Sequence, residues 1–114
     1  MNECIFCRIA NKKIPAKVVF EDTETIAFED LKPQAPVHIL VIPKAHIEKL
    51  SDIDERNSGL VGKLVIAANR IASSKGVAES GYRTVINCNR DAGQEVFHLH
   101  LHLLGGRKFT WPPG

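Results

Sequence analysis

The chain has 114 residues, of which 44% are hydrophobic and 25% are charged, and its formal net charge is +2. This balance is typical of one soluble globular domain, and a charge so near neutrality argues against nucleic-acid or membrane binding as a main task. An anionic ligand would therefore have to be attracted by a local site. Neither an apolar run long enough to span a membrane nor a secretory signal is present, so we expect a cytoplasmic protein.

Hydrophobic patterning predicts an α+β fold, in which an antiparallel sheet of about five strands packs with one long helix and one short helix. The predicted elements, in chain order, are a helical turn at 4–10, a hairpin of strands 17–21 and 25–29, a buried strand at 38–42, a helix at 54–75, and strands at 82–87 and 96–104. Asp54 is the expected N-cap of the long helix, and Gly76 is expected to end it in a left-handed conformation.

Three histidines alternate with apolar residues in the last predicted strand: His98, His100 and His102. Side chains alternate between the two faces of a strand, so the three imidazoles are expected on one face, about 7 Å apart. The residues between and beside them are expected to face the core: Phe97, Leu99, Leu101 and Leu103. A neutral imidazole can attack phosphorus, and its neighbours can stabilise negative charge. Structural histidines and a three-histidine metal site are the alternatives, although one straight strand suits three-fold coordination poorly.

The run from His98 to Leu104 resembles the histidine triad motif of the HIT superfamily, His-φ-His-φ-His-φ-φ, where φ is apolar. The rest of the chain is similar to the Hint branch of that superfamily at Ile14-Pro15-Ala16, Phe28-Glu29-Asp30, Pro33-Gln34-Ala35-Pro36, His38, Val41-Ile42-Pro43-Lys44, Gly81-Tyr82-Arg83, Gly93-Gln94, Leu104-Gly105-Gly106-Arg107 and Trp111-Pro112-Pro113-Gly114. The resemblance implies a single HIT domain over residues 1–114, and a homodimer in which two sheets join into one of ten strands.

The resemblance also implies an activity, because proteins of the Hint branch hydrolyse purine nucleoside phosphoramidates such as AMP joined to an amine. His100 would be the nucleophile that forms a nucleotidyl-histidine intermediate, and His102 would contact the phosphate and assist proton transfer. His98 and His38 would support the nucleophile by hydrogen bonding. The implied ligands are AMP, GMP, a phosphoramidate or an acyl-AMP, with no cofactor needed for catalysis. A dinucleoside polyphosphate hydrolase, or a nucleotide-binding regulatory dimer with incidental hydrolysis, are the alternative functions.

A nucleotide pocket is implied in the same way. Asp30 matches the acid that binds the ribose hydroxyls, which suits a carboxylate because it accepts from two vicinal donors. The apolar positions expected around the base, which could equally be ordinary core, are Phe6, Ile9, Phe28, Leu31 and Ile42. Asn87, Gly93, Gln94 and Glu95 match positions near the phosphate, and Trp111 would border the leaving-group side of the partner's site. Many animal members carry serine in place of Glu95, so we expect this carboxylate to favour cationic amine leaving groups.

Cys4 and Cys7 have the spacing of half a zinc knuckle. Resemblance to bacterial and organellar relatives implies that His46 and His98 complete a structural zinc site, which would pin the N-terminal turn against the sheet. A metal-free thiol pair and a redox couple are the alternatives. Cys88, beside Asn87 in a predicted strand, is expected to be a buried structural cysteine.

Overall fold

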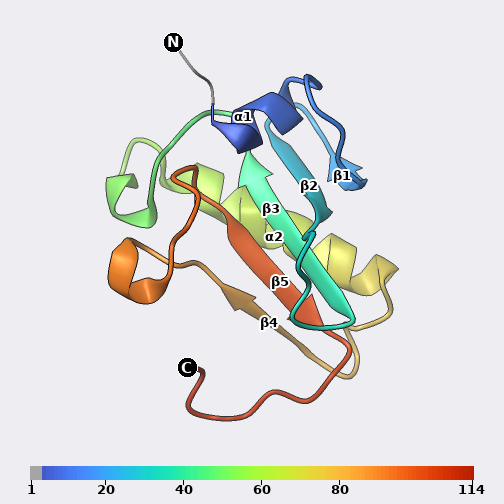
Figure 1. The fold of residues 1–114 in the computed structure, drawn as a ribbon. Coiled ribbons are helices and arrows are strands. Elements are labelled where there is room, and N and C mark those ends of the chain that lie inside the picture. The colour runs from blue at the N-terminus through green and yellow to red at the C-terminus, as the bar shows by residue number, and fades with distance from the viewer. Residues whose placement is uncertain (1–3) are drawn as a thin grey trace.

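The computed structural model describes residues 4–114 and contains a five-stranded antiparallel sheet with a helix on each face (Figure 1). The strands are β1 (Val18–Glu21), β2 (Thr25–Glu29), β3 (Val37–Pro43), β4 (Tyr82–Val85) and β5 (Leu101–Gly105), and their order in the sheet is β1-β2-β3-β5-β4. The helices are α1 (Ile5–Ala10), α2 (Ser58–Ser74) and two short 3-10 turns, η1 (Leu50–Asp52) and η2 (Arg90–Ala92). The α+β prediction, with one long and one short helix, is confirmed.

No helix within residues 4–114 is both long enough and apolar enough to cross a lipid bilayer.

The central strand β3 is buried on both faces, and its side chains alternate between two hydrophobic clusters. Ile39 and Val41 belong to the cluster under α2, whereas Leu40 and Ile42 belong to the cluster under α1. This alternation follows from the two-residue period of a strand. The run of apolar, β-branched residues in β3 therefore separates two cores, and each helix covers one of them.

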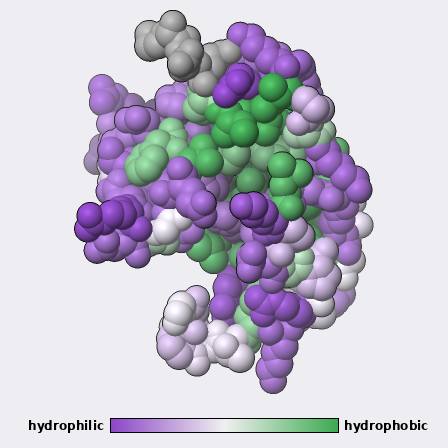
Figure 2. Space-filling model, viewed as in Figure 1, coloured by the Kyte–Doolittle hydropathy of each residue, from purple (hydrophilic) through white to green (hydrophobic). Residues whose placement is uncertain are grey.

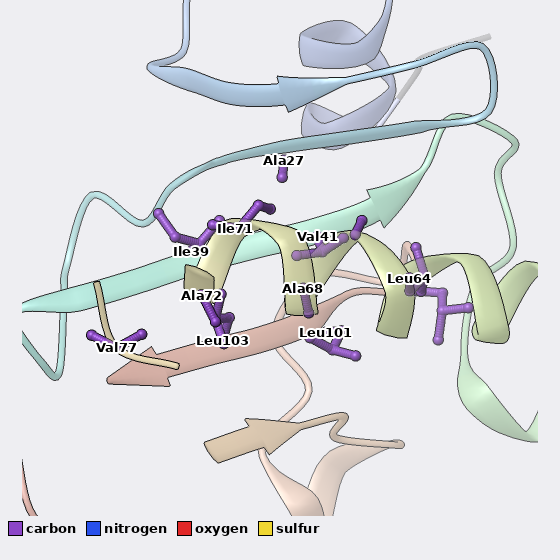
Figure 3. Packing of buried hydrophobic residues seen from close by; sticks show 12 residues of the cluster. Ala27, Ile39, Val41, Leu64, Ala68, Ile71, Ala72, Val77, Leu101 and Leu103 are labelled. Atoms are coloured by element: carbon purple, nitrogen blue, oxygen red, sulfur yellow. The ribbon is translucent and has the colours of Figure 1, made fainter. Parts of the chain in front are cut away.

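Helix α2 covers one face of the sheet with small and branched side chains (Figure 3). Ala68 and Ala72 leave no exposed surface, so the helix axis lies close to the strands. The helix begins at Ser58 with Asn57 as its N-cap, so the predicted cap at Asp54 is wrong. The Asp54 carboxylate instead accepts hydrogen bonds from Arg56 in the preceding turn. Gly76 follows the last turn at φ +76°, as predicted.

Helix α1 lies on the opposite face, above β2 and β3 (Figure 1). The Cys4 thiol sulfur caps the helix by accepting the backbone N–H of Cys7 at 3.2 Å. Phe6 and Ile9 then pack into the second cluster, and the Phe6 ring meets Phe28 edge-on at 5.4 Å between centroids. Hydrophobic surface gathers beneath α1 on this face and is bordered by hydrophilic residues (Figure 2).

The predicted last strand is shorter than expected, because β5 begins only at Leu101 and the segment 96–100 bends before it. Leu99, Leu101 and Leu103 are buried as predicted, but Phe97 is 42% exposed, so its expected place in the core is wrong. The predicted strand at 82–87 also ends early, at Val85. Cys88 consequently lies in a loop and is only half-buried, which corrects its assignment as a buried strand residue.

The packing of α2 predicts a large difference between two leucine truncations. Leu64 has no exposed surface, whereas Leu31 is 98% exposed. We expect Leu64→Ala to lower the free energy of unfolding by about 2–5 kcal/mol, because it leaves a cavity, and Leu31→Ala to change it by less than about 0.5 kcal/mol. Urea unfolding of the two variants without ligand measures both values. Equal losses would contradict the described packing.

Candidate active site and metal centre

Four histidines gather on the α1 face of the sheet, from β3, β5 and the segment before β5. His102 is paired with Leu40 across the two strands, and Leu40 belongs to the α1 cluster. His38 lies two residues before Leu40 and therefore shares that face. The His102 ring lies 5.2 Å from the His38 ring and 5.0 Å from the His100 ring, between centroids.

The ring of His98 turns away from this group and into a cluster with the N-terminal cysteines. Its Nε2 lies 2.8 Å from the carbonyl oxygen of Pro43. A carbonyl can only accept, so we assign the His98 proton to Nε2. The lone pair of Nδ1 then faces the Cys4 sulfur at 3.3 Å and the Cys7 sulfur at 3.5 Å. His98 is completely buried in this position.

The backbone of His98, and not its ring, supports His100. Nδ1 of His100 lies 2.8 Å from the carbonyl oxygen of His98 and therefore donates its proton there. The other ring nitrogen, Nε2, is left with its lone pair. The ring is only 7% exposed and meets the edge of Phe6 at 5.2 Å between centroids. His100 thus presents an unprotonated nitrogen in a sheltered site, as a nucleophile requires.

The ring of His38 contacts the ring of His102. The backbone N–H of Gln34 donates to Nδ1 of His38 at 3.0 Å, which places the His38 proton on Nε2. That Nε2–H donates to Nδ1 of His102 at 2.9 Å. His102 must then carry its own proton on Nε2. The pair therefore has a fixed polarity that ends in an N–H donor on His102.

Burial lowers the pKa of three of these imidazoles. The pKa of His102 falls to about 4, mainly through loss of hydration and in smaller part through the nearby His100 and His38. Loss of hydration also lowers the pKa of His98 and of His38; for His38 the carboxylate of Asp30 opposes the shift. One oxygen of Asp30 lies 3.4 Å from Nε2 of His38. Each of these shifts favours the neutral form of His38, His98 and His102 at neutral pH.

The cluster of Cys4, Cys7, His46 and His98 has the donor set and the spacing of a structural zinc site. Its ligand atoms all lie within 4.8 Å of one another, and the two Nδ1 atoms of His46 and His98 are 3.2 Å apart. In a tetrahedral site with Zn–S of 2.3 Å and Zn–N of 2.1 Å, a sulfur and a nitrogen are about 3.6 Å apart. The sulfur–nitrogen distances here are 3.3–3.5 Å. The residues therefore fit a zinc ion.

Asp30, His38 and His102 form a second group of potential metal ligands. The short contact between the two histidines in this group is explained by a hydrogen bond and requires no metal ion. Coordination of an ion by Nε2 of His38 would move the ring proton to Nδ1. That nitrogen already accepts the N–H of Gln34, and two N–H groups cannot face each other at 3.0 Å. The short distance between His38 and His102 is therefore a hydrogen bond.

The apolar residues expected around a base divide into two groups. Phe6, Ile9 and Phe28 are at least 92% buried in the α1 cluster, and Ile42 has no exposed surface at all. Leu31 is 98% exposed at the start of the loop that leads to His38. The four buried residues are therefore core residues in the absence of a ligand.

The residues expected near the phosphate lie in the loop between β4 and β5. Gln94 is buried, and its side-chain amide accepts the backbone N–H of Asn89 and donates to the carbonyls of Glu48 and Val96. It therefore braces the loop that leads to the histidines. Asn87 is half-buried, Gly93 and Glu95 are exposed, and Trp111 is 83% exposed in the C-terminal tail.

Sequence reasoning missed the backbone groups that orient the rings. The carbonyls of Pro43 and His98 and the N–H of Gln34 each decide where one imidazole carries its proton. Every residue offers the same backbone groups, so no sequence signal marks these three. Only the fold brings them to the rings.

The low pKa of His102 predicts how stability depends on pH. An unfolded histidine titrates near 6.5, so between pH 6.5 and about 4 the unfolded chain binds more protons than the folded chain. The free energy of unfolding should therefore fall as the pH drops from 7 to 4, and His102→Gln should reduce this slope. Urea unfolding as a function of pH measures it. An NMR titration in which the His102 ring protonates near its ordinary pKa would contradict the account.

Comparisons with known proteins agree with this arrangement. The HIT domain family matches residues 11–109. A HIT family hydrolase from Legionella pneumophila has the same fold with a TM-score of 0.96; it is 53% identical, over 98% of this chain and all of that one. An uncharacterised HIT-like protein of Synechococcus elongatus is 50% identical over 98% of this chain and 97% of its own length.

Two further structures have descriptions that bear on the site. One is a zinc-bound histidine triad family protein from Mycobacterium smegmatis, 33% identical with a TM-score of 0.79 over 91% of this chain and 75% of that one. The other is a histidine triad nucleotide-binding protein from Candida albicans, 31% identical with a TM-score of 0.75 over 96% of this chain and 83% of that one. The motif, the fold and these matches agree, and the chain belongs to the HIT domain family.

Proposed function

We propose that this protein hydrolyses the P–N bond of purine nucleoside phosphoramidates, in which AMP or GMP is joined to an amine. The observation that carries the proposal is the hydrogen bond from Nδ1 of His100 to the carbonyl of His98, because it leaves Nε2 unprotonated beside a neutral N–H donor. The family match supports the coarser statement that the protein is a nucleotide hydrolase. Acyl-AMP offers the same α-phosphorus and is a further substrate.

The reaction has two steps at phosphorus. Nε2 of His100 attacks the α-phosphorus, and the electron pair of the P–N bond leaves with the amine, which takes up one proton. The product is a nucleotidyl-histidine, whose ring is cationic. The carbonyl of His98 stabilises this cation through the bond from Nδ1–H. Water then adds to phosphorus, the bond to Nε2 breaks, and the water releases one proton, so the proton balance closes.

His102 acts as a neutral donor to the phosphate. Gln34 donates to His38 and His38 donates to Nδ1 of His102, which leaves Nε2–H of His102 free to donate to a ligand. The rings of His102 and His100 are 5.0 Å apart between centroids, so one phosphate group can meet both. A buried donor of fixed direction stabilises charge that develops on the transferring group.

The nucleotide would lie between α1 and the loop after β2. Asp30 would bind the ribose hydroxyls, and Phe6, Ile9, Phe28, Leu31 and Ile42 would line or support the base site. Asn87 and the turn of Gly93, Gln94 and Glu95 would lie near the phosphate. We expect the exposed carboxylate of Glu95 to favour cationic amines as leaving groups.

Cys4, Cys7, His46 and His98 would hold one structural zinc ion. The ion would supply no step of the reaction; it ties the N-terminal turn to the sheet and fixes the ring of His98. The fit of the four ligand atoms supports this assignment. The carbonyl of His98 accepts the hydrogen bond from His100, so a metal ion that fixes His98 would also restrict the orientation of His100.

A homodimer with a continuous ten-stranded sheet is also proposed. Strand β4 stands at one end of the strand order, so its outer edge has no strand partner within residues 4–114. An unpaired edge is available for pairing with a second copy. Val65 and Ile66 on α2 are 43% and 52% exposed, and a partner would cover such apolar surface. In this dimer Trp111 would border the partner's leaving-group side.

Removal of the nucleophile tests the proposed activity. We expect His100→Ala to lower the turnover of an adenosine 5′-phosphoramidate by roughly a thousandfold or more, because no side chain remains to form the intermediate. AMP binding, measured by calorimetry, should persist. Mass spectrometry of the acid-sensitive adduct after rapid mixing should find one nucleotidyl group on wild-type protein only. Equal turnover in the variant would reject the function, and faster hydrolysis of a diadenosine polyphosphate would favour the other enzyme class.

The zinc assignment predicts metal content and stability. Protein purified without a histidine tag should contain about one equivalent of zinc, and Cys7→Ser should lose the ion and melt at a lower temperature. Cys88→Ser is the matched control, since Cys88 lies in another loop and donates to Ser51. It should keep the metal. Less than about half an equivalent of zinc, with the Cys4 and Cys7 thiols both titratable, would count against the site.

A further inference from the structure

We propose that Arg107 is a positioning residue that fixes the tautomers of His38 and His102 by holding the backbone at Gln34. Arg107 lies outside the candidate site, at an exposed position two residues after the end of β5. The inference deepens the proposed function and rests on it only for the kinetic consequence, because the proton positions can be measured without substrate.

The first observation is that the two backbone groups beside the same Cα atom have different partners. The carbonyl of Gln34 accepts a hydrogen bond from Nε of Arg107 at 3.0 Å. The N–H of Gln34 donates to Nδ1 of His38 at 3.0 Å. Because both groups flank one Cα, a constraint on the carbonyl restricts the direction of the N–H. Arg107 therefore acts on His38 through a single residue.

The second observation is that the chain after β5 lies close to the loop between β2 and β3, which contains Gln34 and Pro36. Gly106 has φ +88°, and a Cβ atom there would lie 2.9 Å from Cβ of Pro36. Such a contact is too short for a real side chain, so only glycine lets the segment lie against the loop. This contact sets Arg107 beside Gln34.

The third observation is that the guanidinium of Arg107 is itself held in place. Its Cζ lies 4.2 Å from the centroid of the Phe109 ring, and its Nη1 donates to the carbonyl of Lys108 at 3.3 Å. A planar guanidinium can stack and donate in its plane at the same time. Contacts with the C-terminal tail thus orient the same guanidinium that donates to the loop.

The consequence concerns the polarity of the His38–His102 pair. With the N–H of Gln34 in place, His38 must carry its proton on Nε2 and donate to His102. Without it, His38 can carry the proton on Nδ1, and its Nε2 then accepts from Nδ1–H of His102. In that reversed state Nε2 of His102 has a lone pair and cannot donate to a phosphate. The hydrogen bond from Gln34 therefore favours the state in which His102 is a donor, and the Asp30 oxygen 3.4 Å from Nε2 of His38 acts in the same direction.

Arg83 provides a matched control. Its Cζ lies 5.0 Å from the same Phe109 ring, and its Nη2 donates to the carbonyl of Thr110 at 3.0 Å. It therefore touches the C-terminal tail as Arg107 does, but the backbone carbonyl that its guanidinium holds belongs to the tail. A change that merely loosens the tail should appear in both variants, whereas a change in His38 should appear only when Arg107 is lost.

The test uses full-length protein with 15N-labelled histidine, compared as wild type, Arg107→Gln and Arg83→Gln. We expect NMR spectra at neutral pH to place the His38 proton on Nε2 in wild type and in R83Q, and to show a mixture of tautomers in R107Q. Arg107 is exposed, so the amide spectrum of R107Q should otherwise match that of a folded protein. An unchanged His38 tautomer in R107Q, or the same change in both variants, would overturn the proposal.

The kinetic consequence is tested on an adenosine phosphoramidate. R107Q should lower kcat by roughly three- to tenfold with little change in KM, as expected when one hydrogen bond in the transition state is weakened. A rise in KM with unchanged kcat would contradict the positioning role. If wild type shows no phosphoramidase activity but R107Q still changes the His38 tautomer, the proposed function fails and the positioning role stands.

Discussion

The hydrogen bond from Nδ1–H of His100 to the carbonyl of His98 is the interaction on which the candidate site depends. It leaves Nε2 of His100 with a lone pair, and it also ties this proposed nucleophile to His98, whose ring has other partners. The ring of His98 is held between the carbonyl of Pro43 and the thiols of Cys4 and Cys7. His98 therefore joins the N-terminal cysteine turn, the end of β3 and His100, the proposed nucleophile.

Hydrogen bonds fix the proton positions of the other imidazoles as well, directly from the backbone for His98 and His38 and through the ring of His38 for His102. Gln34 does so for His38, and His38 in turn does so for His102. Burial completes this arrangement, because loss of hydration lowers the pKa of His102 to about 4 and the ring stays neutral. A neutral ring keeps one donor and one acceptor, whereas a protonated ring would have two donors and no fixed polarity. The core around α1 thus helps to set the protonation of the candidate site.

Much of this arrangement was predictable from periodicity. The limits of β2, the alternation along β3 and the burial of Leu101 and Leu103 follow from apolar residues at strand spacing. The strand predicted at 96–100 is wrong, because the chain bends there although apolar residues and histidines continue to alternate. Phe97 is exposed as a result. An alternating sequence indicates which side chains face the core, but it does not indicate at which residue the strand begins to pair with its neighbours.

The residues of the candidate site could be predicted from the sequence, but the hydrogen bonds that orient their rings could not. The histidine row and the Cys4–Cys7 spacing mark the residue types that do chemistry, but the roles of the rings depend on backbone carbonyls and N–H groups that every residue offers. The most direct test is 15N NMR of histidine-labelled protein at neutral pH, read at the ring of His100. The hydrogen bond to the carbonyl of His98 predicts a proton on Nδ1 and an unprotonated Nε2. A proton on Nε2 of His100 would contradict it, because that nitrogen could not then attack phosphorus.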